Sequence, residues 1–541
     1  MEKKLLIFEP SGARILVDAE ATYLKAIRES GRYVPADCGG KGTCGKCRIV
    51  VQPSPSPTNS DLEHLSEEEL ESGVRLACQH TVENNRRILI PSEAGEAKIL
   101  VDALISRPLV PEIGEAGDIG IAIDLGTTTI VCYFIELGSG TQIDVRREIN
   151  PQIAFGEDVI NRLTYAMNNP GGLQELQDVV WSKIATLVES FLEASGTENM
   201  RLTTGAMVGN TAMHHLALAL PVESLSTAPY KPTETKSRIV QGSDLGLSCL
   251  PQCEFYFAPN ISGYVGGDAL GFILSQALHE YQGVALGIDV GTNGEIIGVD
   301  NGELYCCSAA AGPAFEGARI ACGMRAQDGA IEHMITASSE AAPELSVLGN
   351  SKPVGICGSG VLDAIAELRK VNLIDKSGRL LDGKRIHKIG QHEKAYVIAS
   401  QNEYGIKKPV FISQKDVREV QLAKAAIRAG AEIVLDKLGY TATNLDAVFL
   451  AGAFGNYMKP ESALSIGLLP PIDSDKVVPV GNAAGDGAKR ILVSHHERET
   501  IERISESAKY IELASQIEFN DLFSRATQLT PEVPTIDELT S

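Results

Sequence analysis

The sequence lacks an apolar run long enough to cross a membrane. None of its uninterrupted apolar stretches reaches the roughly 18 residues that a membrane-spanning helix needs. The first segment, MEKKLLIFEP, turns polar too soon for a secretory signal peptide. We therefore expect a cytoplasmic protein without a membrane partner.

The chain also has fewer basic than acidic residues. The chain has 48 Lys and Arg against 70 Asp and Glu, which gives a formal net charge of −22. Nucleic acids and anionic membranes are bound through basic surfaces, so neither is expected as a main partner. A hydrophobic content of 44% is ordinary for a globular protein, and 541 residues are too many for one core. The chain should therefore form several domains.

One pattern occurs twice. Residues 119–131 read IGIAIDLGTTTIV, and residues 286–297 read LGIDVGTNGEII, with Asp289 standing 165 residues after Asp124. Each copy predicts a buried strand, a hairpin turn that begins at the Asp, and a second strand. Glycines in such a turn let backbone N–H groups approach phosphate oxygens, Thr and Asn add donors, and the Asp can hold hydrated Mg²⁺. A plain hairpin turn would explain one copy, but the repetition favours a pair of turns that clamp a polyphosphate.

Eleven cysteines include four with the spacing C-x5-C-x2-C-x30-C, namely Cys38, Cys44, Cys47 and Cys78. In a reducing compartment such a cluster indicates metal binding before disulfides. The glycines around the first three suit an iron–sulfur cluster, which needs backbone N–H groups near its sulfurs. A structural zinc site is the alternative, but it usually uses paired C-x2-C knuckles, and here the fourth Cys stands alone.

The remaining sequence predicts further elements. Residues 1–95 should form a small module of strands and short helices, with a capping box at Ser66 and Glu69. Strand–glycine–helix junctions are expected at Ile356–Gly360 and Ala447–Gly455. His214 and His215 are predicted to be helix residues, with metal or cobalt ligation as the alternative. The tail after about residue 525 is expected to be frayed.

The cysteine spacing resembles that of a β-grasp [2Fe–2S] ferredoxin. Its first gap is one residue longer than in the plant-type pattern and nearer the adrenodoxin-like one. The resemblance implies that a [2Fe–2S] cluster is held by Cys38, Cys44, Cys47 and Cys78.

The paired Asp-Gly-Thr turns and the later LAGAFG turn resemble the actin/hexokinase/Hsp70 (ASKHA) ATPase superfamily. Ala453 stands where that family often has a second glycine. The resemblance implies ATP and Mg²⁺ as cofactors, with Asp124 and Asp289 as the carboxylates that position metal or water. The residues implied to bind the nucleotide are Gly126, Thr127, Thr128, Gly291, Thr292, Asn293, Gly294, Gly358, Gly360, Gly452 and Gly455.

A ferredoxin head fused to this ATPase, with the motifs NPQ, GEDVINR, GNTAMHH, GPAFEGA and ICGSG, resembles the reductive activators of corrinoid proteins. The resemblance covers essentially the whole chain. It implies an α+β multi-domain fold, in which a β-grasp [2Fe–2S] ferredoxin domain precedes a duplicated α/β actin-like (ribonuclease H-like) ATPase. The expected limits are 1–92 for the ferredoxin domain, 93–118 for a linker, 119–282 for the first ATPase subdomain and 283–541 for the second.

Members of that family restore corrinoid methyltransferase systems whose cobalt has become inactive Co(II). The resemblance implies an ATP-hydrolysing reductase that passes an electron from its cluster to the Co(II) corrinoid of a partner protein and regenerates Co(I). It also implies an upstream low-potential electron donor. The corrinoid partner would belong to an O-demethylase or related methyltransferase system of anaerobic metabolism, and a homodimer is compatible with the resemblance. The small-residue loop Ser308–Gly317 is expected to approach the corrinoid.

Three other functions remain open at this point. An activator of a radical enzyme would share the ATPase fold, but such activators carry a [4Fe–4S] cluster that bridges a homodimer. A sugar or acid kinase needs a catalytic Asp beside a hydroxyl-binding set that the sequence does not show. A nucleotide-switched redox sensor would change partner affinity without delivering electrons stoichiometrically.

Overall fold

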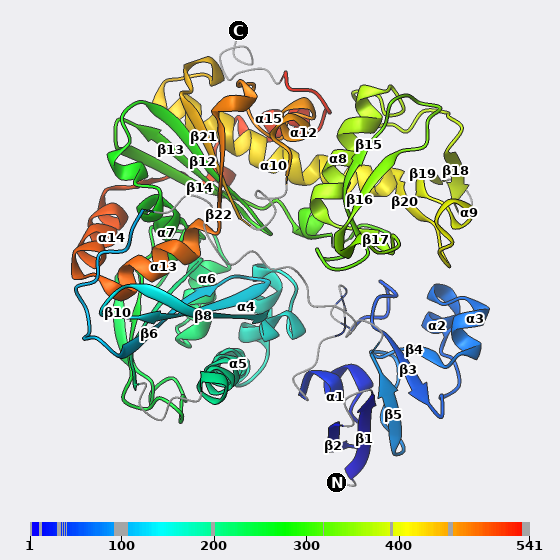
Figure 1. Cartoon of the computed structure of the whole chain (residues 1–541), viewed down its shortest axis with the longest axis horizontal. Helices are drawn as coiled ribbons and strands as arrows, with labels where there is room; N and C mark the ends of the chain where they lie inside the picture. The colour runs from blue at the N-terminus through cyan, green and yellow to red at the C-terminus, as the bar shows by residue number, and fades with distance from the viewer. Residues whose placement is uncertain are drawn as a thin grey trace. The chain divides into compact units, whose positions relative to one another are not determined.

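The computed structural model describes residues 3–532 apart from 10–12, 30–33, 35, 37, 39, 91–106, 196–200, 318, 390–392 and 453–457. The chain divides into two compact units (Figure 1). One unit comprises Met1–Glu96 together with Pro151–Glu157, and the other comprises Ala97–Asn150 together with Asp158–Ser541. Most of the residues predicted to form the linker, 93–106, lie outside the described part of the chain.

The first unit contains a five-stranded sheet with the order β2-β1-β5-β3-β4. Its strands are β1 Lys3–Glu9, β2 Ala13–Asp18, β3 Arg48–Gln52, β4 Val74–Leu76 and β5 Arg86–Leu89, and its helices are α1 Tyr23–Glu29, α2 Asn59–His64 and α3 Glu67–Glu71. Strand β1 pairs in parallel with β5 and antiparallel with β2. Alternating residues of β1 and β3, such as Leu6, Phe8 and Ile49, are fully buried, as period-2 patterning predicts. The capping box at Ser66 and Glu69 is confirmed. This mixed sheet is the expected ferredoxin-type fold.

The second unit is built on two six-stranded sheets. The first has the order β10-β11-β9-β6-β7-β8, with β6 Asp118–Leu125, β7 Thr129–Glu136, β8 Thr141–Ile149, β9 Arg201–Gly209, β10 Arg238–Gln241 and β11 Glu254–Phe257. The second has the order β22-β21-β12-β13-β14-β23, with β12 Val284–Val290, β13 Gly294–Asp300, β14 Glu303–Ala309, β21 Ala447–Ala451, β22 Val477–Gly481 and β23 Lys509–Tyr510.

The two sheets repeat one topology. In the first, β6 pairs antiparallel with β7 and parallel with β9, and β9 pairs parallel with β11. In the second, β12 pairs in the same senses with β13 and β21, and β21 pairs parallel with β22. Asp124 and Asp289 occupy equivalent positions next to the hairpin turns of β6–β7 and β12–β13. The repeat predicted from the sequence is therefore a repeat of structure, and the fold is the expected actin-like one.

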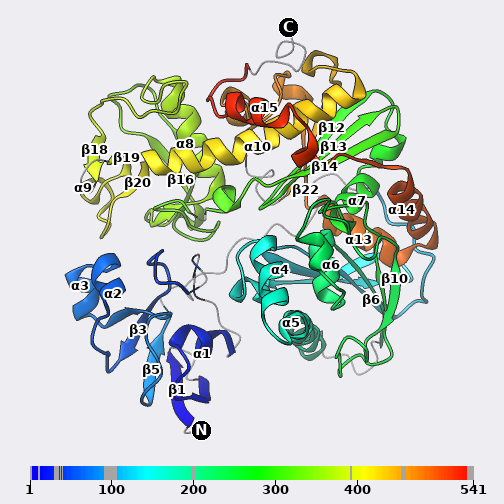
Figure 2. The ribbon, with the colours of Figure 1, turned by 180° about the vertical axis from the view of Figure 1, so that it is seen from behind.

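Helices cover both faces of the first sheet (Figures 1 and 2). On one face lies α5, Gly172–Ser195, whose Phe191 stacks on Phe134 with ring centroids 3.9 Å apart. On the other lies α13, Ala483–Val493, whose Lys489 lies over the ring of Tyr133. Because Tyr133 and Phe134 are consecutive in β7, they point to opposite faces of the sheet. The first sheet is thus buried on both sides.

Helix α13 crosses α7, Gly267–Ser275, at close range. A Cβ added to Gly487 would lie 2.3 Å from the Cα of Gly271, so this crossing requires glycine. Both α13 and α14, His495–Ser507, contact α7. All strands of the first large sheet precede the predicted boundary between residues 282 and 283, and all strands of the second follow it. Helices α13 and α14 also follow this boundary in the sequence, but they pack on the side of the first sheet. The predicted domain limits otherwise remain a prediction.

The second unit also contains elements outside its two large sheets. Helix α10, Gln414–Leu438, contacts β13 and β14. Two small sheets consist of β15 Ala330–Ile335, β16 Glu344–Val347 and β17 Gly355–Ile356, and of β18 Ile386–Ile389, β19 Glu393–Ala399 and β20 Val410–Ser413. The remaining helices are α4 Val159–Asn168, α6 Thr211–Ala217, α8 Gly358–Lys370, α9 Gln401–Tyr404, α12 Pro460–Ser465 and α15 Phe519–Ala526.

The expectation of a frayed tail after residue 525 is wrong as far as residue 532. Leu529 is buried, and the buried side chain of Lys424 donates a hydrogen bond to the carbonyl of Gln528. Arg428 of the same helix donates to the carbonyl of Pro531 over 3.1 Å. The composition of the tail gave no sign of these anchors, and residues 533–541 lie outside the described part. Among the described helices, none combines the length and the apolar character needed to cross a bilayer.

Candidate functional site

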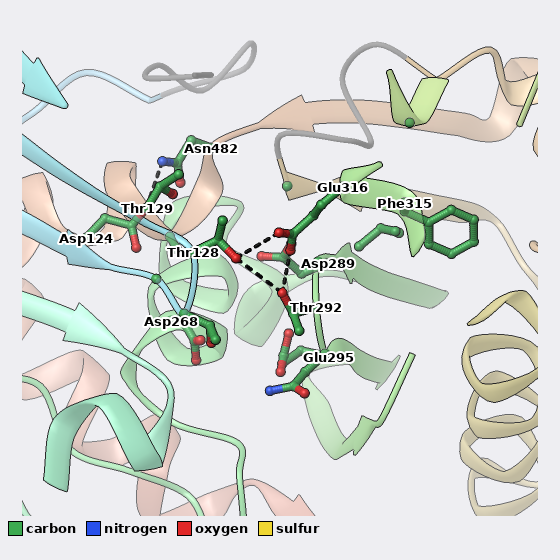
Figure 3. A pocket seen from close by; sticks show the side chains of 18 of the residues that line it. Asp124, Thr128, Thr129, Asp268, Asp289, Thr292, Glu295, Phe315, Glu316 and Asn482 are labelled. Carbon is green, nitrogen blue, oxygen red and sulfur yellow. Dashed lines mark hydrogen bonds between the residues drawn. The ribbon is translucent and has the colours of Figure 1, made fainter. Parts of the chain in front are cut away.

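A cavity of about 260 Å³ lies where the two hairpin turns face each other (Figure 3). The first hairpin contributes Asp124 at the end of β6 and residues 126–129 after it. The second contributes residues 289–293 from the end of β12 and its turn, and Glu295 from the start of β13. Further lining residues come from distant elements and are Asn210, Asp268, Phe315, Glu316, Met324, Arg325, Ala326, Cys357, Gly358, Ser359, Gly452, Asn482 and Ala484.

Most of the predicted nucleotide residues line this cavity. They are Asp124, Gly126, Thr127, Thr128, Asp289, Gly291, Thr292, Asn293, Gly358 and Gly452. Gly452 has φ +90, and a Cβ at this position would lie 2.5 Å from Asp289 Oδ1, so only glycine allows the end of β21 to lie so close to that carboxylate.

Three predicted glycines are placed differently. Gly294 packs against Ile427, and Gly360 lies against the carbonyl of Ile331, so neither lines the cavity. Close packing explains why both are glycine. Gly455 lies outside the described residues.

The first turn is held in place by three buried side chains from the motifs NPQ, GEDVINR and GNTAMHH. Asn150 donates to the carbonyl of Gly126 over 2.8 Å, and Arg162 donates to the carbonyl of Thr127 over 2.5 Å. Asn210 donates to Thr127 Oγ1 over 3.1 Å and caps α6. These motifs therefore fix the backbone and one hydroxyl of the first turn.

Two threonines connect the turns across the cavity. Thr128 Oγ1 and Thr292 Oγ1 lie 3.4 Å apart, and both hydroxyls donate to the carboxylate of Glu316, which lies 2.7 Å from Thr128 Oγ1 (Figure 3). Glu316 was not singled out from the sequence, although it stands in the GPAFEGA motif. The expectation that Ser308–Gly317 approaches the corrinoid is not supported, because Pro313, Ala314 and Phe315 are buried and Phe315 and Glu316 line this cavity.

Buried carboxylates gather at the same place. Burial raises the pKa of Asp124 to about 6, although the Asn482 amide, which donates to it over 2.8 Å, acts in the opposite direction. Burial and the charge of Asp124 raise the pKa of Asp289 to about 7. Burial also raises the pKa of Asp268 to about 7, and the N–H of Ala269 opposes this while the charges of Asp289 and Asp124 add to it. For Glu295, burial and then the charge of Asp268 raise the pKa well above its ordinary value.

Such a group of carboxylates fits a divalent cation, which would offset their mutual repulsion. In the described part of the chain no three acidic, His or Cys side chains converge on one point that could hold a metal ion. Mg²⁺ typically takes one or two carboxylates and completes its shell with phosphates and water. Asp124 and Asp289 would hold the ion in this way.

The four predicted cluster cysteines lie in the first unit as two pairs. Cys47 Sγ and Cys78 Sγ are 3.3 Å apart, and the free thiol of Cys44 donates a hydrogen bond to the side chain of Cys38. Two thiolate pairs suit the two irons of a [2Fe–2S] cluster better than the single tetrahedral centre of zinc. Backbone N–H groups also point at the sulfurs. Burial acts to raise the pKa of Cys38. Hydrogen bonds to its sulfur, of which the one from the N–H of Thr43 has the largest effect, outweigh burial and lower the pKa to about 7.

His214 and His215 of α6 are 5% and 0% exposed. His215 is held by the carbonyl of Thr211 at 2.8 Å and by the N–H of Thr233 at 3.2 Å. Burial lowers the pKa of His214 to about 3, so this ring is neutral. Both are helix residues packed inside the protein, and the alternative of ligating a partner's cobalt is not supported.

The fold and the two sites define an iron–sulfur protein with an actin-like nucleotide-binding unit. Family models agree with this over nearly the whole chain. Residues 7–83 match a 2Fe-2S iron-sulfur cluster binding domain, residues 119–281 the RACo middle region, and residues 283–538 the C-terminal domain of RACo, described as the ASKHA domain. The chain belongs to the RACo family of reductive activators of corrinoid proteins.

Individual relatives support the assignment. The corrinoid activation enzyme RamQ of Eubacterium limosum is 33% identical over 500 residues, which cover 90% of this chain and 80% of RamQ. A [Co(II) methylated amine-specific corrinoid protein] reductase of Methanosarcina barkeri is 26% identical over 432 residues, 75% of this chain and 76% of that protein. Among solved structures, a reductive activator for corrinoid, iron-sulfur protein has a TM-score of 0.71, 29% identity and 98% coverage of both chains.

Proposed function

We propose that this chain is an ATP-hydrolysing reductase that delivers one electron to the Co(II) corrinoid of a partner protein and so restores Co(I). The observation that carries the proposal is the 33% identity to a corrinoid activation enzyme over 90% of the chain. The partner is a corrinoid protein of a methyltransferase system, and the upstream donor is a low-potential electron carrier.

In the first unit, Cys38, Cys44, Cys47 and Cys78 hold a [2Fe–2S] cluster. When bound, this cluster supplies a one-electron carrier of low potential. The protein's own contribution is a set of backbone and side-chain donors to the sulfurs. The Gln79 amide, for example, donates to the sulfur of Cys78 over 3.3 Å. Such donors stabilise negative charge on the sulfurs.

In the second unit, the turns at Asp124 and Asp289 hold Mg²⁺ and the phosphates of ATP. Thr127, Thr128, Thr292 and Asn293 line the cavity and supply donors to the phosphates. Asn482 keeps the carboxylate of Asp124 oriented into the cavity. Asp289 stands at the equivalent place in the second repeat, so the two carboxylates flank the polyphosphate.

ATP is needed because Co(I) is a strong reductant and its formation from a ferredoxin-type donor is uphill. For a one-electron transfer, a gap of about 200 mV corresponds to about 5 kcal/mol. ATP-driven closure of the cavity can supply free energy of this order if it changes cobalt ligation or water access in the bound partner.

The proposal is tested by replacing Asp289 with Ala. We expect Mg-ATP hydrolysis to fall at least about 100-fold, because the loss of a metal-positioning carboxylate removes several kcal/mol of transition-state stabilisation. Loss of the Co(II) electron paramagnetic resonance signal of an added corrinoid protein should slow in parallel. Asp244→Ala, which removes an exposed loop carboxylate, is the control. ATP hydrolysis that survives in Asp289→Ala would show that this cavity is not the ATPase site.

A further inference from the structure

Glu316 connects the hairpin turns of the two repeats across the cavity. One carboxylate oxygen accepts the hydrogen bond of Thr128, from the first turn, and the other accepts that of Thr292, from the second. These threonines are 164 residues apart in the sequence. A single carboxylate side chain therefore bridges the two phosphate turns (Figure 3).

This arrangement uses the donors that a phosphate would need. A threonine hydroxyl has one proton to donate, so Thr128 and Thr292 can each donate to Glu316 or to a phosphate oxygen, but not to both. A carboxylate beside a phosphate also adds like-charge repulsion inside a cavity already lined by Asp124, Asp268, Asp289 and Glu295. Glu316 and a bound polyphosphate therefore exclude each other from these hydroxyls.

Two glycines with positive φ flank the short turn that carries Glu316. Glu316 ends the short 3-10 turn Pro313–Glu316 (η5), which Gly312 with φ 76 precedes and Gly317 with φ 80 follows. Both positions lie in the left-handed region, which glycine adopts without strain. The turn itself is anchored by the buried ring of Phe315, which is 2% exposed, whereas Glu316 is only half-buried.

We propose that Glu316 is an internal competitor of the nucleotide's polyphosphate. Its carboxylate bridges the two phosphate turns, and ATP binds only when Glu316 leaves Thr128 and Thr292. This inference rests on the proposed nucleotide site. It adds a residue that lowers ATP affinity and links nucleotide occupancy to the position of η5, which packs against α8 and α10.

The test is calorimetric binding of a non-hydrolysable ATP analogue with Mg²⁺ to the full chain. Glu316→Gln keeps the size of the side chain but removes its charge, and we expect the analogue to bind more tightly by on the order of tenfold. Glu316→Asp, whose shorter side chain cannot reach both turns, should tighten binding to a smaller extent. Glu340→Gln removes an exposed carboxylate elsewhere and should leave the affinity unchanged.

Thermal unfolding separates competition from a merely structural role. Without nucleotide, Glu316→Gln should melt below the wild type, because the bridge is weakened, but the analogue should raise its Tm by more than it raises the wild-type Tm. If neither variant binds the analogue more tightly than a wild type that does bind it, the role of Glu316 is refuted and the nucleotide site stands. If the wild type binds no analogue, the proposed function fails and this inference fails with it.

Discussion

The cysteine pairs are the clearest feature at the scale of single residues. The cysteines and both turn aspartates could be predicted because each stands in a local pattern: a fixed spacing with glycines, or the end of an apolar strand. Asp268, Glu316 and Asn482 were missed because only the fold brings them to the cavity. The Asn482 amide donates a hydrogen bond to Asp124, which is 358 residues away in the sequence, and no local pattern predicts such a contact.

We predict that Cys78→Ala abolishes assembly of the [2Fe–2S] cluster. The reason is that Cys78 pairs with Cys47 at 3.3 Å, so one iron would lose one of its two thiolates. The visible absorbance and the iron content of anaerobically purified protein should both fall to background. Cys249→Ala, which changes a half-buried thiol of the second unit, should keep two irons per chain. Stoichiometric zinc in place of iron in the wild type would support the structural-zinc alternative instead.

A buried lysine predicts the pH dependence of stability. Burial, with the charge of Arg428 as a lesser cause, lowers the pKa of Lys424 from 10.5 to about 7. Between these values the unfolded chain binds more protons than the folded one, so Lys424 makes the free energy of unfolding rise with pH. The slope is at most about 1.4 kcal/mol per pH unit.

Lys424→Met should therefore flatten the rise of apparent Tm between pH 7 and pH 9, as measured by differential scanning calorimetry. Lys437→Met alters an exposed lysine of the same helix α10 and should keep the wild-type slope. An unchanged slope in Lys424→Met would mean that Lys424 is charged in the folded protein throughout this range.

At the scale of elements, local hydrophobic periodicity predicted the long strands and helices with apolar faces. The strands before both turns, helix α5 and the strand–turn–helix junction at α8 all follow from the sequence. The positions of α13 and α14 do not, because a helix's own sequence shows which face is apolar but not which sheet that face will cover. The anchoring of residues 527–532 was missed for the same reason, since it depends on donors from α10.

Helix α6 gives a prediction that joins local stability to the nucleotide site. Asn210 Oδ1 accepts the N–H of Met213 over 2.9 Å, while its amide holds Thr127 Oγ1. Asn210→Ala should cost about 1 kcal/mol of stability through the lost cap, whereas Asn210→Ser keeps a capping hydroxyl and should cost less. Both variants lose the contact to Thr127, so both should raise the KM for ATP several-fold. A serine variant with a wild-type KM would show that Asn210 acts only as a helix cap.

At the scale of the whole molecule, function depends on the presence of two units in one chain. The ferredoxin-type unit holds the thiolates, and the duplicated unit builds one cavity from two copies of the same hairpin. The duplication could be recognised in the sequence because both hairpin turns contain an Asp followed two residues later by a Gly. The family could be predicted because the motifs occur in order along nearly the whole chain, and the relatives bear this out.

The most direct measurement is anaerobic formation of Co(I). Dithionite-reduced protein is mixed with a Co(II) corrinoid protein, and the Co(I) absorbance is followed with and without Mg-ATP. We predict that Co(I) forms only when ATP is present and does not form with Cys44→Ala, which lacks one of the four cluster thiolates. Absence of Co(I) under every nucleotide condition, with an intact cluster and active ATP hydrolysis, would contradict the proposal and direct attention to another electron acceptor.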